Sequence, residues 1–160
     1  MTSSITLLLA VALSSPLAVL AADSHDHGHG KSEPQKLELN AGKKWGTDAA
    51  LRQAMSGIQK SVAHTLPAAH SGKATAADYD AFGKEVSAQV AYMVENCKLD
   101  PKADAQLHLI VADIMNGVEA AQGKQGEKKR AAGVVKVAQA ANAYGKHFDH
   151  TGWQAIKLPH

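Results

Sequence analysis

Residues 92–108 read YMVENCKLDPKADAQLH, and this stretch indicates where one helix ends and the next begins. Apolar residues recur at helical spacing up to Cys97. The Asp-Pro pair at 100–101 is typical of a helix start, because aspartate accepts hydrogen bonds from the free N–H groups and proline fits the first turn. We therefore expect a helical hairpin whose reversal brings Met93 level with His108, with Cys97 close to the turn.

Four segments in all carry apolar residues at helical spacing, and mostly short links join them. Thr75 and Asp78 form a capping signal for the second segment, and Pro67 is expected to end the first. This pattern predicts an all-α fold, an up-down-up-down antiparallel four-helix bundle. The expected helices cover about 48–66 and 76–97, then run from Pro101 to Gly123 and from Gly126 to Gly152.

The composition fits a single helical domain. The chain has 160 residues, of which 45% are hydrophobic and only 4% aromatic, which favours closely packed helices over a β-sandwich. The net charge of +2 comes from scattered residues and does not suggest a nucleic-acid partner. Nucleophile-elbow, phosphate-loop, H-E-x-x-H and di-iron E-x-x-H motifs are absent from the sequence, so we expect a binding protein and no enzyme.

The apolar run at 5–20, ITLLLAVALSSPLAVL, ends in small residues of the kind that signal peptidase accepts. We expect a cleaved signal peptide over 1–21, with Ala22 as the alternative last residue, and a periplasmic protein that does not associate with the membrane after cleavage. The alternative is a membrane anchor, which Pro16 and the shortness of the run disfavour. Export places the chain in an oxidising compartment.

A polar segment rich in histidine, glycine and serine follows the signal, and we expect it to be flexible over 22–46. His25, His27 and His29 alternate with other residues, a pattern typical of modest binding of Cu(II), Ni(II) or Zn(II). The alternative is a solvated linker. The bundle is expected over 47–152, and a tail over 153–160 is expected to pack back on it.

Sulfur and imidazole groups are expected to gather at one end of the bundle. In an up-down bundle, that end holds the start of the first and third helices and the end of the second and fourth. Met and Cys select soft ions such as Cu(I), and imidazole suits copper and zinc, so copper or zinc is the expected ligand. Alternatively the methionines only fill the core. The candidate ligands in this part of the chain are Met55, Met93, Cys97, His108, His147 and His150.

Cys97 is the only cysteine of the chain. In an oxidising compartment it has no partner within its own chain. Three interpretations therefore stay open: a buried inert thiol, a metal ligand, or a disulfide between two copies that gives a homodimer.

The chain resembles the periplasmic four-helix cytochromes, the b-type member most and cytochrome c-prime more distantly. The resemblance rests on an early methionine in the first helix (Met55), the sequence Asn-Ala-Tyr at 142–144, and the Gly/Lys-rich link at 122–129. It implies a haem b held between Met55 and a histidine late in the last helix. That histidine position falls on Gly145, and His147 lies two residues further, about 200° around the helix. Covalent c-type haem is excluded because the chain has no C-x-x-C-H motif.

Three functional hypotheses follow from these patterns. The leading one is a periplasmic metal-binding bundle, for copper in the first place, that serves metal binding, storage or delivery. The second is a b-type haem protein for electron transfer, using Met55 with His147 or His108. The third is a structural or chaperone-like bundle without a cofactor, in which the sulfur atoms only pack.

Overall fold

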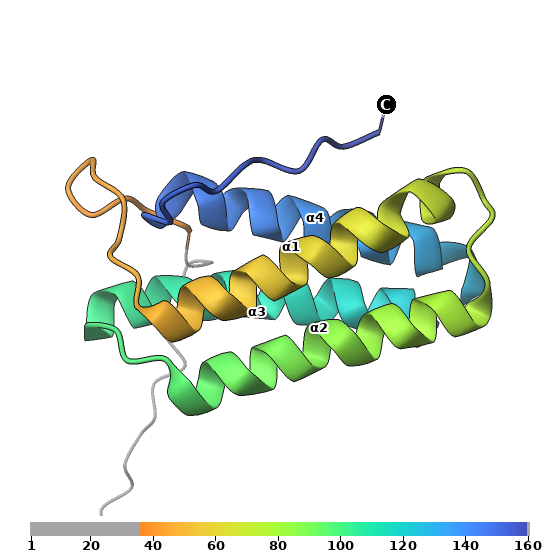
Figure 1. Cartoon of the computed structure of the whole chain (residues 1–160), viewed down its shortest axis with the longest axis horizontal. Helices are drawn as coiled ribbons and strands as arrows, with labels where there is room; N and C mark the ends of the chain where they lie inside the picture. The colour runs from red at the N-terminus through yellow and green to blue at the C-terminus, as the bar shows by residue number, and fades with distance from the viewer. Residues whose placement is uncertain (1–35, 160) are drawn as a thin grey trace, which may run out of the picture. The chain divides into compact units, whose positions relative to one another are not determined.

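In the computed structural model, which describes residues 36–159, these residues form four α-helices and one turn of 3-10 helix. Figure 1 shows the four helices side by side, with successive helices running in opposite directions. The all-α prediction is therefore confirmed. No helix among the described residues is long and apolar enough to cross a membrane. The elements are α1 (Ala49–His70), α2 (Ala76–Asn96), α3 (Pro101–Ala121), η1 (Glu127–Lys129) and α4 (Arg130–His147).

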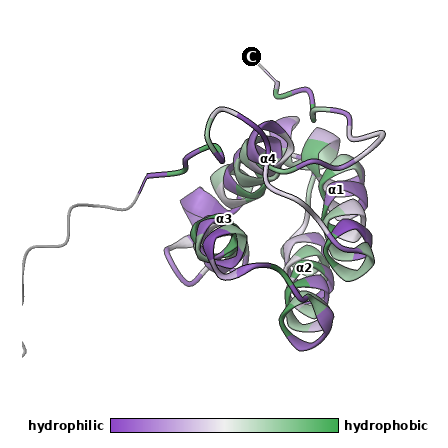
Figure 2. Cartoon of the chain, turned by 90° about the vertical axis from the view of Figure 1, so that its left-hand side faces the viewer, coloured by the Kyte–Doolittle hydropathy of each residue, from purple (hydrophilic) through white to green (hydrophobic). Residues whose placement is uncertain are grey.

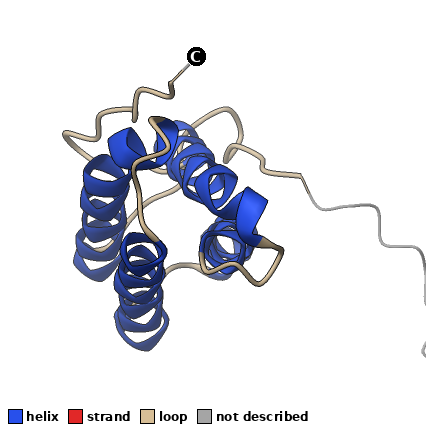
Figure 3. Cartoon of the chain, turned by 90° about the vertical axis from the view of Figure 1, so that its right-hand side faces the viewer, coloured by secondary structure: helices blue, strands red, loops and turns tan. Residues whose placement is uncertain are grey.

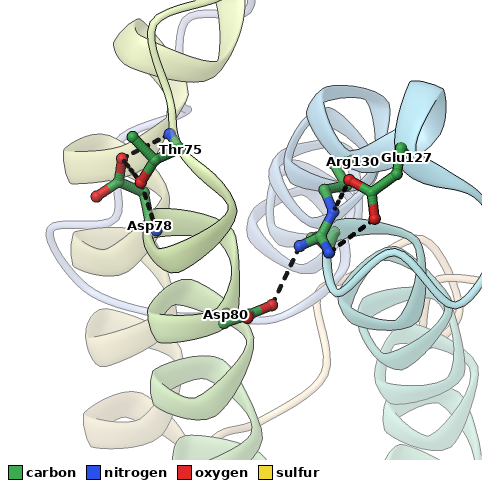
Figure 4. A network of polar contacts seen from close by, with 6 residues as sticks. Thr75, Asp78, Asp80, Glu127 and Arg130 are labelled. Atoms are coloured by element: carbon green, nitrogen blue, oxygen red, sulfur yellow. Dashed lines mark hydrogen bonds and ion pairs between the residues drawn. The ribbon is translucent and has the colours of Figure 1, made fainter.

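The predicted caps of α2 and α3 are confirmed. Thr75 and Asp78 exchange hydrogen bonds in a capping box at the start of α2 (Figure 4). The carboxylate of Asp100 accepts hydrogen bonds from two N–H groups of the first turn of α3. Asp48 does the same for α1, where its Oδ1 lies 2.7 Å from the backbone nitrogen of Leu51. These side chains satisfy N–H groups that have no partner within their helix.

The predicted end of α1 at Pro67 is wrong, because the helix continues through this proline to His70. Proline removes one hydrogen bond and crowds the carbonyl group one turn earlier. That carbonyl belongs to the exposed residue Ala63. Beyond the proline, Ala69 is buried in the core, so packing of the last turn outweighs the local cost.

The expected end of α4 at Gly152 is also too late. The helix ends at His147, and Phe148 takes an extended conformation. There the chain pairs with residue 45: the backbone N–H of Trp45 donates to His147 O (2.8 Å), and Asp149 N–H donates to Trp45 O (2.8 Å). The indole of Trp45 is buried, so the packed part of the chain begins before the expected boundary at residue 47.

The apolar stripes of all four helices meet in one core, and Figure 2 looks along it from the end where α1 and α3 begin. Met55, Met93 and Tyr144 are among the side chains that are almost wholly buried. The tail packs back on the bundle as expected: Asn142 exchanges two hydrogen bonds with the backbone of Ile156, and Trp153 rests on the core.

At the opposite end of the bundle, seen in Figure 3, one arginine joins three segments. The Arg130 side chain donates to Glu127 and to Asp80 of α2 (Figure 4). It also donates to the carbonyl oxygen of Ala121 in α3. Only 12% of this side chain is exposed. The start of α4 is therefore a junction between helices and not merely a solvated charge run.

Candidate functional site

A groove between the end of α2 and the start of α3 brings three of the predicted ligands together. The chain reverses after Cys97, so that Met93 on α2 and Cys97 directly after α2 line the same groove as His108 on α3. The groove has a cavity volume of about 280 Å³. Its lining residues are Met93, Val94, Cys97, Asp104, Leu107, His108 and Val111.

The three ligands lie at different depths in this groove. Met93 is buried, with 1% of its surface exposed. Cys97 is half-buried and caps the end of α2, where its N–H donates to Met93 O (2.8 Å). The imidazole of His108 is 73% exposed, so it lies at the rim and does not enter the core.

His108 is oriented by the preceding turn of its own helix. Its Nδ1 lies 2.9 Å from the backbone oxygen of Asp104 and 3.4 Å from that residue's Oδ2. A ring whose Nδ1–H donates in this way presents Nε2 as its free acceptor, which is how ligand histidines are commonly held. Asp104 was not among the predicted site residues, although its spacing of four from His108 places both on one helix face.

The Cys97 thiol is held in its neutral form. Burial raises its pKa to about 12, helped by the charge of Asp48 and a hydrogen bond to that carboxylate. Burial opposes ionisation of Asp48 too, but N–H groups of Lys98 and Leu51 donate to it, and its pKa is lowered overall. The Lys98 contact measures 2.6 Å between N and Oδ2. Asp48 thus connects the start of α1 to the end of α2, and a metal ion on Cys97 has to displace a proton.

The remaining predicted ligands lie apart from the groove lining. Met55 is wholly buried in the core. His147 is half-buried near the end of α4, with Nδ1 2.8 Å from Ala143 O. His150 Nδ1 lies 3.0 Å from the hydroxyl of Tyr144. Of the predicted ligands, the groove lining thus includes Met93, Cys97 and His108, while His147 and His150 make their contacts at the end of α4.

That second group is an aromatic cluster. The ring of Tyr144 stacks on Phe148 at a centroid distance of 5.3 Å and meets Trp153 edge-on at 5.0 Å. Burial, with a smaller effect of the Arg52 charge, lowers the pKa of His150 below its usual value. Burial also raises the pKa of the Tyr144 hydroxyl. Both groups therefore stay neutral at pH 7.

A histidine at residue 145, where the resemblance places the haem ligand, does not fit these residues. The position of the family's axial histidine is Gly145, and a Cβ added there would overlap the indole nitrogen of Trp153. The tail therefore fills the space on that side of α4. His147, two residues further, has its Nδ1 2.8 Å from the backbone oxygen of Ala143, which leaves Nε2 free, as in His108.

Within residues 36–159, no three His, Cys, Asp or Glu side chains lie close enough together to hold a metal ion. The groove adds the thioether of Met93, a soft ligand of the kind that Cu(I) accepts. His25, His27 and His29 lie outside the described residues.

Comparison with known proteins gives no relatives: no family model, no curated protein and no solved structure matches this chain.

Proposed function

We propose that this protein is a periplasmic metal-binding bundle that holds a soft ion, Cu(I) in the first place, in the groove between α2 and α3. The observation that carries the proposal is the shared lining of this groove by Met93, Cys97 and His108. These residues supply a thioether, a thiol and an imidazole, the three side-chain types that suit Cu(I). The predicted signal peptide supports the periplasmic location.

The groove favours a soft ion because of where each ligand lies. Met93 and Cys97 offer sulfur from the buried side, and His108 offers imidazole nitrogen from the rim. The neutral thiol of Cys97 loses its proton when the ion binds, so affinity rises with pH. The histidines before residue 30 would capture the ion first. The protein would then serve metal binding, storage or delivery, with zinc as the second ion to test.

The test is a titration of the full-length apo-protein with Cu(I) against a chelating dye, without oxygen. The variants are Met93→Leu, which removes sulfur but keeps volume, and Cys97→Ser. Each is expected to weaken Cu(I) binding by tenfold or more. Wild-type protein is also expected to release about one proton per ion from its single thiol in weakly buffered solution at pH 7.

Two matched controls separate ligand loss from general damage. Met55→Leu removes a buried sulfur that is not part of the groove lining, and His70→Ala removes an exposed imidazole at the other end of α1. Both are expected to leave Cu(I) affinity unchanged. Equal affinities in wild type, Met93→Leu and Cys97→Ser would refute the groove as a metal site.

The other two hypotheses are separated by simple measurements. An absorption spectrum of protein produced with haem present would show a Soret band if haem b were bound by Met55 with His147 or His108. A cofactor-free bundle would carry no stoichiometric metal when isolated without an affinity tag, and chelators would leave its melting temperature unchanged.

A further inference from the structure

The C-terminal tail, residues 153–159, runs without helix or turn across the seam between α1 and α4 (Figure 1). The side chain of Asn142 on α4 accepts a hydrogen bond from Ile156 N–H (2.7 Å) and donates one to Ile156 O (2.9 Å). From α1, Gln59 Nε2 donates to Gln154 O (2.5 Å). All three hydrogen bonds go to the main chain of the tail. Main-chain hydrogen bonds give affinity when a protein binds an extended peptide, and side-chain contacts add specificity.

Three apolar side chains of the tail make the contacts that give specificity. Trp153, Ile156 and Leu158 are partly buried against the core. The ring of Trp153 meets Tyr144 edge-on at a centroid distance of 5.0 Å. Gly145 leaves the space that this indole occupies, because a Cβ at that position would overlap it. The seam therefore fits an extended peptide with one aromatic residue followed by aliphatic residues three and five positions later.

The tail fills the seam only in part. The indole nitrogen of Trp153 is buried, and residues 36–159 offer it no acceptor, which weakens the docking of the tail because this N–H has given up water. A cavity of about 500 Å³ remains between the tail and α1, where its lining runs from Ser56 to Pro67. The tail belongs to no helix, so it can leave the seam without unfolding one.

A short hinge separates the tail from the part of the chain that is fixed on the bundle. Asp149 N–H donates to Trp45 O (2.8 Å), and Asp149 O accepts from Thr47 Oγ1 (2.6 Å). The reversal into the tail then uses the exposed residues Thr151 and Gly152, of which Gly152 has a φ of +81°. Glycine adopts φ of either sign readily, so rotation here can direct the tail away from its own seam. Short hinges favour exchange of a terminal segment between copies.

We propose that the seam between α1 and α4 is a docking site for the tail of a second copy, and that two copies associate by exchanging tails. The structure shows what fits the seam, because the chain's own tail is seated there. Each copy offers one tail and one seam, so reciprocal exchange uses the same contacts twice and association stops at a dimer. At low concentration the short tether keeps each tail in its own seam. This surface is separate from the groove between α2 and α3 and needs no metal.

The test mixes two full-length variants, neither of which can dock its own tail. The seam variant (Gln59→Ala, Asn142→Ala) keeps the tail, and the tail variant (Trp153→Ala, Ile156→Ala) keeps the seam. Each alone is expected to sediment as a monomer. The equimolar mixture is expected to sediment as a dimer at or below ~1 mM protein, the effective concentration that a short tether provides within one chain. A mixture that stays monomeric over this range would overturn the proposal.

Tryptophan fluorescence checks which contact forms. Trp153 of the seam variant should become buried on mixing, which shifts its emission to shorter wavelength, whereas Trp45 is present in both variants and already buried. Circular dichroism first checks that each variant keeps wild-type helix content. Asn142→Leu, which keeps the volume of the side chain, replaces the seam variant if helix content falls.

A matched control and a peptide exclude the other ways of associating. A chain with all four substitutions, mixed with the seam variant, should stay monomeric, and a dimer there would place the contact elsewhere and overturn the proposal. A synthetic peptide of residues 150–160 should bind the tail variant. If it binds while the two variants do not associate, the seam accepts free peptides and exchange between copies is refuted.

Discussion

The two long seams of α3 differ in how closely the neighbouring helix approaches. Along α4 the backbones are in contact, since a Cβ added to Gly133 would lie 2.6 Å from the carbonyl oxygen of Gly117. Along α2 the seam is lined by large side chains such as Met93 and Leu107, and it opens into the groove. One helix therefore supplies a closed structural seam on one side and an accessible candidate site on the other. Glycines let the backbones of α3 and α4 approach closely, whereas long side chains keep α2 and α3 further apart.

The substitution with the largest expected effect disrupts the closed seam between α3 and α4. Gly133→Ala places a methyl group against backbone atoms of α3, which have no rotamer to move into, so the helices must separate. We expect a loss of about 2–3 kcal/mol in the free energy of unfolding, measured by urea denaturation. The control is Gly57→Ala, where the added Cβ meets only the side chain of Gln89. That variant should be neutral or slightly stabilising, because alanine is the better helix former.

The second prediction concerns the open seam between α2 and α3, where stability is expected to depend on pH. The raised pKa of Cys97 means that the folded protein keeps a proton that the unfolded chain loses above pH 9. Stability is therefore fully present below pH 9 and falls as pH rises toward about 12. Because Cys97 is partly exposed, we expect only about 1.5 kcal/mol of loss by ~pH 10.5. Cys97→Ser lacks the thiol, so this loss of stability at alkaline pH should be absent from the variant. Equal dependence of stability on pH in the two proteins would refute the prediction.

The third prediction tests the end of the bundle opposite the groove, where Arg130 connects the start of α4 to α2 and α3. Arg130→Lys keeps the charge but loses the planar group that donates to Glu127 through two nitrogens. Because the acidic partners are exposed, we expect a loss of about 1 kcal/mol, measured by thermal or urea unfolding. Lys128→Ala, at an exposed position two residues earlier, is the control and should change stability by less than ~0.5 kcal/mol.

Local patterns predicted the helices because caps and apolar spacing act within a few residues. The capping box at Thr75 and the Asp-Pro start at 100–101 are examples. The predictions were wrong where residues distant in the sequence determine the end of a helix. Pro67 stays inside α1 because Ala69 after it packs in the core, and α4 ends early because Phe148 pairs with Trp45, about a hundred residues away.

The candidate site was predicted only in part for the same reason. The reversal after Cys97 explains why Met93 and His108 share a groove. The outward position of His108 depends on its contact with Asp104, and the close α3–α4 seam depends on two glycines sixteen residues apart. Helical spacing places such residues on a face, but the depth of each side chain follows from how closely the neighbouring helix packs.

The substitution with the smallest expected effect tests whether the groove between α2 and α3 is open in the absence of metal. Val94 is 72% exposed, so Val94→Ala loses little apolar burial and gains helix propensity. We expect apo-protein to gain ~0.3 kcal/mol in the free energy of unfolding. The matched control is Val90→Ala, one turn earlier and buried, which should cost about 1–3 kcal/mol. A loss near 1 kcal/mol for Val94→Ala would contradict the exposed position of this side chain.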